Sequence, residues 1–333
     1  MTGMRRIGET VASARERVEA RGSGAEKPVP VPWPTVADAL GGGLWPGLHV
    51  LAGEGDRSSW AVEAVVHAAS DGVPVLYLSP ELDSLGLHCR ALSTLARLRC
   101  SADVAWSDAY VGRNRFPDGV AEALEAMPIY FPELDAVGFT GAAILGAVNA
   151  FRELHPRAEH PRALVVVDSL QMVASPDGVR EEARERVGRA AATCLTAARR
   201  HEAAVLALSS VSRRGADDAR EALREWRRGG SPRLADLASV AKESGDVECL
   251  ADSVLVLCGH GDEQRLMAPK VLAGVPAWCD ARLHGDPPAR PVITEVPWPP
   301  RRGRGSRQKQ GGTLTMDGKH ARRPPDFDDG GTQ

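Results

Sequence analysis

The hydrophobic positions of the chain fall into short aliphatic runs that alternate with helical patterns from residue 48 onward. The runs LHVLA, PVLYLS, PIYF, ALVVVDS, AAVLALS and SVLVLC are apolar at consecutive positions, which is typical of strands buried on both faces. Helical patterns lie between them, from Ser59 and near 84–98, 142–154 and 181–200. This alternation predicts a doubly wound α/β domain, with a mostly parallel sheet and helices on both faces.

A charged amino-terminal helix is predicted ahead of this domain, over residues 4–21. Its apolar positions Ile7, Val11, Ala14 and Val18 follow the four-three spacing of a heptad seam. A Gly- and Pro-rich linker over 22–34 separates the helix from the main body. The spacing leaves two alternatives open: the seam packs on its own domain, or it packs on a neighbouring subunit.

The carboxyl-terminal part of the chain changes in composition. From Pro287 it is rich in proline, glycine and polar residues, with a basic group over 301–309. We expect a disordered tail over 287–333, either solvated or in contact with nucleic acid or an acidic partner. The predicted organisation is a linker helix and linker over 1–34, a main domain over 35–286, and this tail.

Composition excludes several classes of protein. The 333 residues carry 41 basic and 44 acidic side chains, a net charge of −3, and 43% are hydrophobic, which indicates a soluble globular chain. No apolar run approaches the roughly 20 residues of a membrane span. The first residues contain no apolar signal region, so we expect a cytoplasmic protein. The six cysteines lack paired spacing, which favours reduced thiols over a metal site.

The first strand leads into a glycine-containing turn and a helix, the position at which phosphate-binding proteins carry a P-loop. In GxxxxGK[ST], backbone N–H groups surround the phosphates, the lysine reaches the β and γ oxygens, and the hydroxyl holds Mg²⁺. In the ungapped register Ser58 replaces the second glycine, Ser59 the lysine and Trp60 the hydroxyl. A plain strand-to-helix turn is the alternative. The candidate nucleotide-binding residues here are Gly53, Gly55, Arg57, Ser58 and Ser59, and Arg57 reaches a phosphate only if the loop is shorter than the standard one.

Two carboxylates follow predicted strands at the same edge of the sheet. Asp168 ends the run ALVVV, as the aspartate of a Walker B motif does, and Glu81 follows PVLYLS. Such a pair suits metal binding and activation of an attacking water. Asp168 alone is equally compatible with a capping role.

The order of these motifs resembles one family over most of the chain. WPTVADALGGGLWPGLHVLAG, YLSPEL, ALVVVDSLQMV and KESGDVECLADSVLVL are similar, in order and spacing, to the carboxyl-terminal domain of DnaB-type replicative helicases, a RecA-like ATPase. The resemblance extends from the heptad helix to about Leu283. It implies a RecA-like P-loop NTPase fold, a linker helix that docks on the adjacent subunit of a hexameric ring, a catalytic role for Glu81 and a Mg²⁺-orienting role for Asp168 when nucleotide is bound.

The chain also departs from the family pattern at charged positions. Ser59 stands at the P-loop lysine, Ser210 at a glutamine that follows the fourth strand, and Leu272 at the arginine finger. Lys270 matches the lysine that acts in trans across the subunit interface. Because an arginine finger alone supplies about 10³ to 10⁵ in rate, these losses predict weakened or lost ATP hydrolysis.

An arginine-rich segment over 212–236 occupies the position of the family's DNA loop in the central channel. Such loops track a phosphate backbone without reading bases, and Trp226 is available for stacking. A solvated helix with ion pairs is the alternative, because acidic residues interleave with the arginines. The candidate DNA-binding residues are Arg213, Arg214, Arg227, Arg228 and Arg233.

The resemblance therefore implies ATP-dependent DNA unwinding or translocation in DNA replication, with hydrolysis weakened or lost and with ATP and Mg²⁺ bound weakly or not at all. The alternative is a non-catalytic ring subunit, or a scaffold that binds single-stranded DNA and associates with an active helicase hexamer. A third possibility is a protein that only decorates such a ring through its heptad helix.

Overall fold

The computed structural model describes residues 6–176, 179–230, 237–238, 245–259, 265–271, 277–283 and 293–296. Within them the chain forms one nine-stranded sheet in the order β3-β2-β4-β5-β1-β6-β7-β8-β9. The strands are β1 (Gly47–Gly53), β2 (Val75–Leu78), β3 (Ile129–Tyr130), β4 (Leu164–Val167), β5 (Ala204–Ser210), β6 (Ser253–Cys258), β7 (Arg265–Val271), β8 (Ala277–Leu283) and β9 (Ile293–Val296).

The first six strands of that order are parallel, and β7 to β9 add an antiparallel extension. The parallel part confirms the predicted doubly wound sheet. Each of its strands arises from one of the predicted aliphatic runs. In β1, β2, β4, β5 and β6 the burial of residues on both faces explains why those runs are apolar, while β3 is half-buried.

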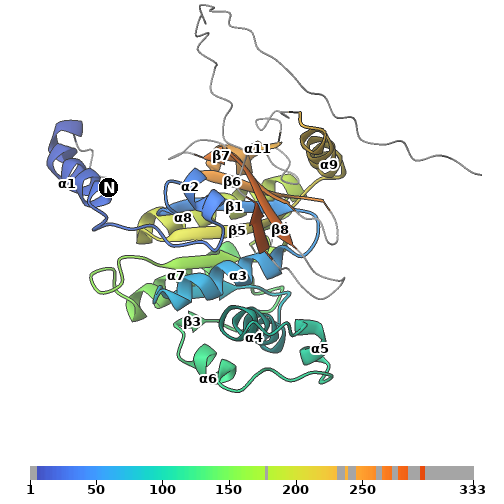
Figure 1. Ribbon diagram of the computed structural model, residues 1–333. Helices are drawn as coiled ribbons and strands as arrows, with labels where there is room; N and C mark the ends of the chain where they lie inside the picture. Colours follow the sequence, from blue (N-terminus) through green and yellow to red (C-terminus); the bar gives the residue numbers. More distant parts are fainter. Residues whose placement is uncertain are drawn as a thin grey trace, which may run out of the picture. The chain divides into compact units, whose positions relative to one another are not determined.

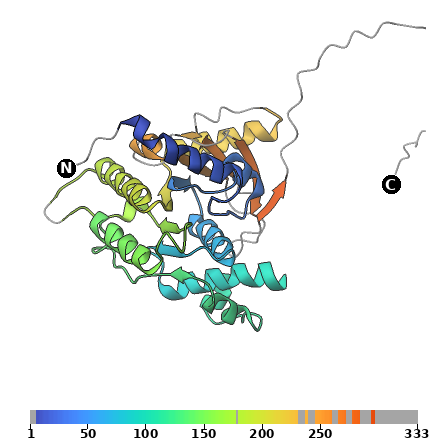
Figure 2. The same cartoon turned by 90° about the vertical axis from the view of Figure 1, so that its left-hand side faces the viewer.

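Helices cover both faces of this sheet. On one face α2, α3 and α4 pack against alternate strand residues, and on the other face α7, α8, α9 and α11 do so. In Figure 2, α7 and α8 lie to the left of the strands and α3 to their right, while Figure 1 labels the elements. The described helices are α1 (Val11–Gly22), α2 (Pro34–Ala39), α3 (Arg57–Ser70), α4 (Ser84–Cys100), α5 (Trp106–Tyr110), α6 (Val120–Glu125), α7 (Gly141–Leu154), α8 (Ala183–His201), α9 (Arg213–Arg227) and α11 (Gly245–Leu250).

The amino-terminal helix is shorter than predicted. A 3-10 turn over Ile7–Thr10 precedes α1, and α1 has no buried residue. The seam residues Ile7, Val11 and Val18 are 88%, 46% and 69% exposed. The seam is therefore not packed on the described part of its own domain.

The structure describes one strand within the predicted tail. Ile293–Val296 form β9 and pair antiparallel with β8, so the sheet continues beyond residue 286. The β-branched residues of this segment favour a strand. The prediction of a disordered tail rested on the prolines and glycines around it. The rest of the predicted tail lies outside the described residues.

Candidate functional site

The parallel strands bring the predicted site residues to one edge of the sheet. Gly53 ends β1, Ser210 ends β5 beside it in register, and Asp168 directly follows β4. Because β2 pairs with β4 in parallel, the segment after β2 that carries Glu81 reaches the same edge. The fold therefore gathers the candidate phosphate turn and both predicted carboxylates.

The turn between β1 and α3 is short, with only Glu54, Gly55 and Asp56 between the two elements. At Gly53 a Cβ would lie 2.5 Å from the Cβ of Leu257 on β6, so strand packing requires a glycine there. Gly55 has φ +90°, a left-handed conformation that glycine adopts without steric cost. Both glycines thus have local structural roles that do not depend on a phosphate.

Asp56 places a carboxylate at the amino terminus of α3. Its Oδ1 accepts a hydrogen bond from the Ser59 backbone N–H at 3.1 Å, and its Oδ2 accepts one from the Ser59 hydroxyl at 2.6 Å. Arg90 of α4 pairs with the same carboxylate at 2.6 Å, and its guanidinium lies 3.7 Å from the ring centroid of Trp106. Since a helix amino terminus is a binding position for anions, the chain supplies its own anion there.

Arg57 turns back toward the strand ends. Its Nη1 donates to the carbonyl of Gly53 at 2.7 Å, and its Nη2 lies 3.5 Å from the Ser210 hydroxyl. The loop is shorter than a standard P-loop, which was the condition for a phosphate role of Arg57. The guanidinium is nevertheless engaged by the ends of β1 and β5.

Trp60 follows in the first turn of α3 and belongs to the core. Its side chain is fully buried, and its ring centroid lies 5.3 Å from that of Trp33. The position that carries the magnesium-binding hydroxyl in the ungapped P-loop register is thus part of the apolar layer beneath α2 and α3.

Asp168 is buried and accepts two hydrogen bonds at one oxygen. The Ser58 hydroxyl donates to its Oδ2 at 2.7 Å and the Tyr77 hydroxyl at 2.8 Å. Burial raises the pKa of Asp168, and the two hydrogen bonds with the charges of Arg57 and Arg90 act against that rise. Burial and the neighbouring carboxylate raise the pKa of Tyr77 well above its ordinary value, so the phenol is a neutral donor to Asp168.

Glu81 lies on the surface beside this cluster. Its side chain is exposed, and its backbone N–H donates to the Ser79 hydroxyl at 3.1 Å. The structure therefore places Glu81 near the edge at which Asp168 lies, with its carboxylate open to solvent.

Gln171 is a polar residue of this edge that the sequence analysis missed. Its amide Nε2 donates to the Ser209 hydroxyl at 2.9 Å, and its Oε1 accepts from the Ser210 backbone N–H at 3.1 Å. The end of β5, where the family pattern has a glutamine, is thus bonded by a glutamine from the short helix after β4. The signal in the sequence was the motif DSLQ, in which Gln171 follows Asp168 by three residues.

The arginine-rich segment forms a helix, α9, which is connected to the phosphate turn. The Arg220 Nη2 donates to both carboxylate oxygens of Glu54, at 2.8 and 2.7 Å, and its Nη1 pairs with Asp217 at 2.7 Å. Glu54 belongs to the turn between β1 and α3. The sequence alone did not show this pair, because 166 positions separate the two residues.

The predicted DNA-binding arginines lie at the two ends of α9. Its small and apolar residues pack against the sheet, so the other side of the helix faces solvent. Of the predicted residues, Arg213, Arg214, Arg227 and Arg228 are exposed, and Arg224 on the same helix is exposed as well. Arg233 lies outside the described residues.

Lys270 is on β7, and its Nζ donates to the backbone carbonyl of Glu248 in α11 of the same chain. Leu272, at the arginine-finger position, lies outside the described residues.

Among the described residues there is no group of three or more His, Cys, Asp or Glu side chains that could hold a metal ion. The cysteines whose side chains are described are free thiols. In the same part of the chain, every helix is too short or too polar to cross a membrane.

The strand order, the glycine turn before α3 and the aspartate after β4 define the RecA-like ATPase class of folds. The chain belongs to the DnaB-like helicase C-terminal domain family, whose family model matches residues 37–268, more than half of the chain. A search of curated proteins gave no match.

Two examples represent the solved structures that share this fold. One is described as an ATPase domain; it has a TM-score of 0.63 and 17% identity, and the match covers 84% of this chain and 96% of that one. The other is described as a DnaB-like replicative helicase and its interactions with primase; it has a TM-score of 0.64 and 17% identity, and the match covers 85% of this chain and 66% of that one.

Proposed function

We propose that this protein is a DnaB-like ring subunit of the cytoplasm that has lost ATP hydrolysis and keeps the parts that assemble subunits and contact single-stranded DNA. In this proposal it acts as a non-catalytic member of a ring or as a scaffold beside an active helicase hexamer. ATP and Mg²⁺ are then bound weakly or not at all.

The residues of the phosphate turn do not fit a triphosphate. Asp56 already accepts the Ser59 N–H at the start of α3, where a phosphate oxygen would bind. Of the cations nearby, Arg57 is turned to the carbonyl of Gly53 and Arg90 is paired with Asp56. A triphosphate would therefore meet a carboxylate, and the arginines beside it already hold other partners.

The occupied amino terminus of α3 is the observation that carries the proposal. A carboxylate at this position is worth about 0.3–1 kcal/mol to the helix, and more when partly buried. The Asp56–Arg90 pair adds a second contact that nucleotide binding would have to break. Because Asp56 and Arg90 already occupy this turn, no phosphate has to be neutralised there. This accounts for serine at the position of the P-loop lysine.

The DNA-contact part of the proposal rests on α9. The exposed arginines at its two ends, Arg213, Arg214, Arg227 and Arg228, suit a phosphate backbone, and binding of this kind falls with rising salt concentration. The acidic residues between them, among them Asp217 paired with Arg220, keep part of the helix surface neutral. We therefore expect sequence-independent binding that depends strongly on salt.

Phosphate release from ATP in the presence of Mg²⁺ tests this function. The protein and its Glu81→Gln variant are compared with and without single-stranded DNA. We expect both to release phosphate at the same background rate, because the wild-type turn holds no triphosphate. A DNA-stimulated rate in the wild type that Glu81→Gln abolishes would refute the proposal in favour of an active helicase ATPase.

A further inference from the structure

A cavity lies at the amino ends of the parallel strands, on the edge of the sheet opposite the phosphate turn. Its volume is about 220 Å³, and its lining includes Pro46 just before β1, Ala163 just before β4 and Ala204 at the start of β5. Asp168 and Ser210 lie at the carboxyl ends of the same strands. The cavity is therefore separate from the candidate functional site.

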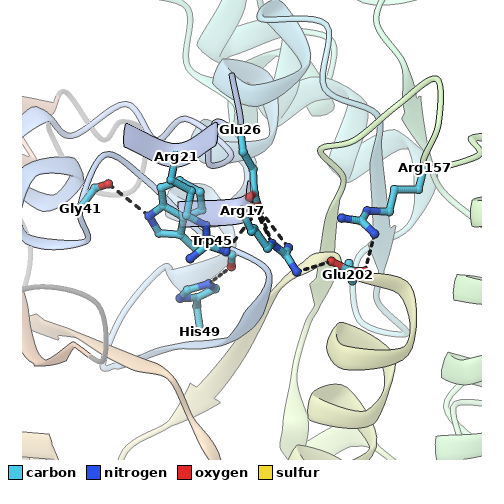
Figure 3. Close-up of polar contacts among 8 residues, drawn as sticks. All are labelled: Arg17, Arg21, Glu26, Gly41, Trp45, His49, Arg157 and Glu202. Carbon is cyan, nitrogen blue, oxygen red and sulfur yellow. Dashed lines mark hydrogen bonds and ion pairs between the residues drawn. The ribbon is translucent and has the colours of Figure 1, made fainter. Parts of the chain in front are cut away.

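Charged side chains from four segments of the chain meet in the lining of this cavity. Helix α1 supplies Arg17, the linker after it Glu26 and Lys27, the loop between α7 and β4 Arg157, and the turn after α8 Glu202. Figure 3 shows Glu202 between the guanidinium groups of Arg17 and Arg157. Because these segments are far apart in the sequence, no local pattern marks the cavity.

The two carboxylates hold the arginines at the cavity wall and leave donors for a ligand. The Nε of Arg17 lies 3.0 and 3.1 Å from the two oxygens of Glu26, and an ion pair of 2.7 Å joins its Nη1 to Oε2 of Glu202. The other oxygen of Glu202 pairs with Nη1 of Arg157. Within the described residues Arg157 uses only this nitrogen, and Lys27 has no hydrogen bond or ion pair. Both cations can therefore accept an anionic partner.

Positive charge exceeds negative charge around the cavity. Arg162 also belongs to the lining, so that four cations face two carboxylates. Two partners from outside the lining cancel one another, because Asp71 pairs with Arg162 at 2.6 Å and Arg21 contacts Glu26 at 3.3 Å. An anion that enters the cavity would compensate the remaining excess.

Arg152 of α7 adds a buried positive charge beside the cavity. It is only 8% exposed, its Nη1 donates to the His160 carbonyl at 3.1 Å, and its Nη2 has no hydrogen-bond partner in the part of the chain that the structure describes. Burial and the charge of Arg157 lower the pKa of Arg152, while Glu202 acts against this. The buried guanidinium thus interacts with two charges of the lining and strengthens the positive potential there.

The rest of the lining is apolar and fixed by backbone hydrogen bonds. Val29 and Leu44 are buried and exchange two such bonds, at 2.9 and 2.8 Å, in an antiparallel bridge. A wall of this kind favours a ligand with a carbon body. The volume corresponds to about seven water molecules of about 30 Å³ each, and sites for drug-sized ligands begin at roughly 300 Å³. A nucleoside triphosphate is therefore too large, whereas a small organic anion fits.

We propose that this cavity binds a small organic dianion, with its charged groups on Lys27 and Arg157 and its carbon body on the apolar wall. Carboxylate and phosphate groups both suit these cations, because arginine binds either with two donors. Inorganic pyrophosphate suits the cavity poorly, since it has no carbon body and its higher charge meets Glu26 and Glu202. The ligand joins the linker after α1 to the main body, and its binding does not depend on the proposed ring function.

Calorimetric titration of the full chain with succinate, propyl phosphate and pyrophosphate tests the site. We expect at least one of the two organic anions to saturate it with a Kd below about 1 mM. The tighter of the two shows whether carboxylate or phosphate is preferred. Lack of saturation by both organic anions, or equally tight binding of pyrophosphate, would overturn the inference.

Variants of the lining should change the affinity in opposite directions. Arg157→Gln is expected to weaken binding about tenfold, the lower end of what a hydrogen bond to a charged group supplies. Glu202→Gln removes a like charge from the lining and should tighten binding about threefold or more. Arg99→Gln is the matched control, because Arg99 is exposed at the end of α4, away from the lining. Equal affinities of Arg157→Gln and Arg99→Gln would refute the site; if Arg157→Gln does not fold, Lys27→Gln replaces it.

Hydrogen exchange with the bound anion locates the site. We expect slower exchange over residues 25–29 and 157–163, which line the cavity, and unchanged exchange in the phosphate turn over 53–59. Protection of the phosphate turn instead would place the anion at the opposite edge of the sheet and overturn this inference. That result leaves the test of the ring-subunit function by phosphate release from ATP unaffected.

Discussion

Replacement of Asp56 by asparagine tests whether a carboxylate excludes phosphate from the start of α3. Asparagine caps helices as well as aspartate does, so the bond from the Ser59 N–H is kept and the helix begins at the same residue. The Arg90 ion pair is lost. Because the Asp56 side chain is 43% exposed, this loss is expected to cost no more than about 1 kcal/mol of folding free energy.

The effect on anion binding follows from the distance between the two charges. A phosphate that took the Ser59 N–H would lie about 4 Å from the Asp56 carboxylate, where like unit charges repel by about 4 kcal/mol at an effective dielectric constant of about 20. Exposure to solvent reduces this repulsion to a fraction of that value. A remaining repulsion of about 1.4 kcal/mol corresponds to a tenfold change in affinity. We therefore expect Asp56→Asn to bind pyrophosphate or Mg-ATP about tenfold or more tightly than the wild type.

Titration calorimetry with the two ligands measures this gain. Asp71→Asn is the matched control, because Asp71 lies at the other end of α3 and pairs with Arg162 at 2.6 Å. The control removes the same charge from the same helix, and we expect no change in anion binding. If Asp56→Asn binds no more tightly than Asp71→Asn, the carboxylate is not what excludes phosphate.

Three further predictions concern the buried cluster, α9 and the central strand. Tyr77→Phe removes one of two donors to buried Asp168 and is expected to lower the free energy of unfolding by about 1–3 kcal/mol, as measured with urea. Arg213→Ser combined with Arg214→Ser should weaken binding to single-stranded DNA and reduce the salt slope by at most about 1.4, since each phosphate contact contributes about 0.7. Burial lowers the pKa of His49 below 6.5, so the stability it contributes is present above that pH and is lost as pH falls toward the lower value. Urea unfolding at about pH 7.5 and about pH 5.5 should show a loss of stability that His49→Gln reduces.

Each of these predictions has a control on the same kind of element. Tyr110→Phe changes an exposed phenol on Asp83 and should leave stability near the wild-type value. Arg199→Ser with Arg200→Ser removes two exposed arginines from the last turn of α8 and should leave DNA binding unchanged. His88→Gln changes an exposed histidine and should keep the wild-type pH dependence. Equal effects in a control and its test variant would contradict the corresponding argument.

Much of the fold was predictable because strands buried on both faces must be apolar at every position. Five of the six parallel strands follow from that rule, and β3 is half-buried. The antiparallel strands β7 to β9 do not follow from it. Arg265 and Lys270 break the apolar pattern of β7, because strands in an extension at the edge of a sheet can carry charged residues. The strand Ile293–Val296 within the predicted tail was missed because the prolines beside it obscured its β-branched residues.

The position of the candidate site could be predicted, but the pairing of its side chains with one another could not. The glycine turn and Asp168 could be assigned from strand ends, whereas the capping role of Asp56 was not predicted, because the helix was expected to begin at Ser59 and begins at Arg57. The partners that close the turn come from far along the chain: Arg90 is 34 positions from Asp56, and Arg220 is 166 positions from Glu54. Local patterns carry no information about such pairs. The length of the loop was likewise fixed only by where α3 begins.

Titration of the wild-type protein with Mg-ATP, in the presence and absence of single-stranded DNA, tests most directly whether Asp56 and Arg90 exclude nucleotide from the start of α3. With Asp56 bound to the Ser59 amide and Arg90 bound to Asp56, we expect no saturation of nucleotide binding in the micromolar range in either condition, while the single-stranded DNA binds with or without nucleotide. Saturable binding of Mg-ATP at micromolar affinity, unaffected by Asp56→Asn, would contradict the account.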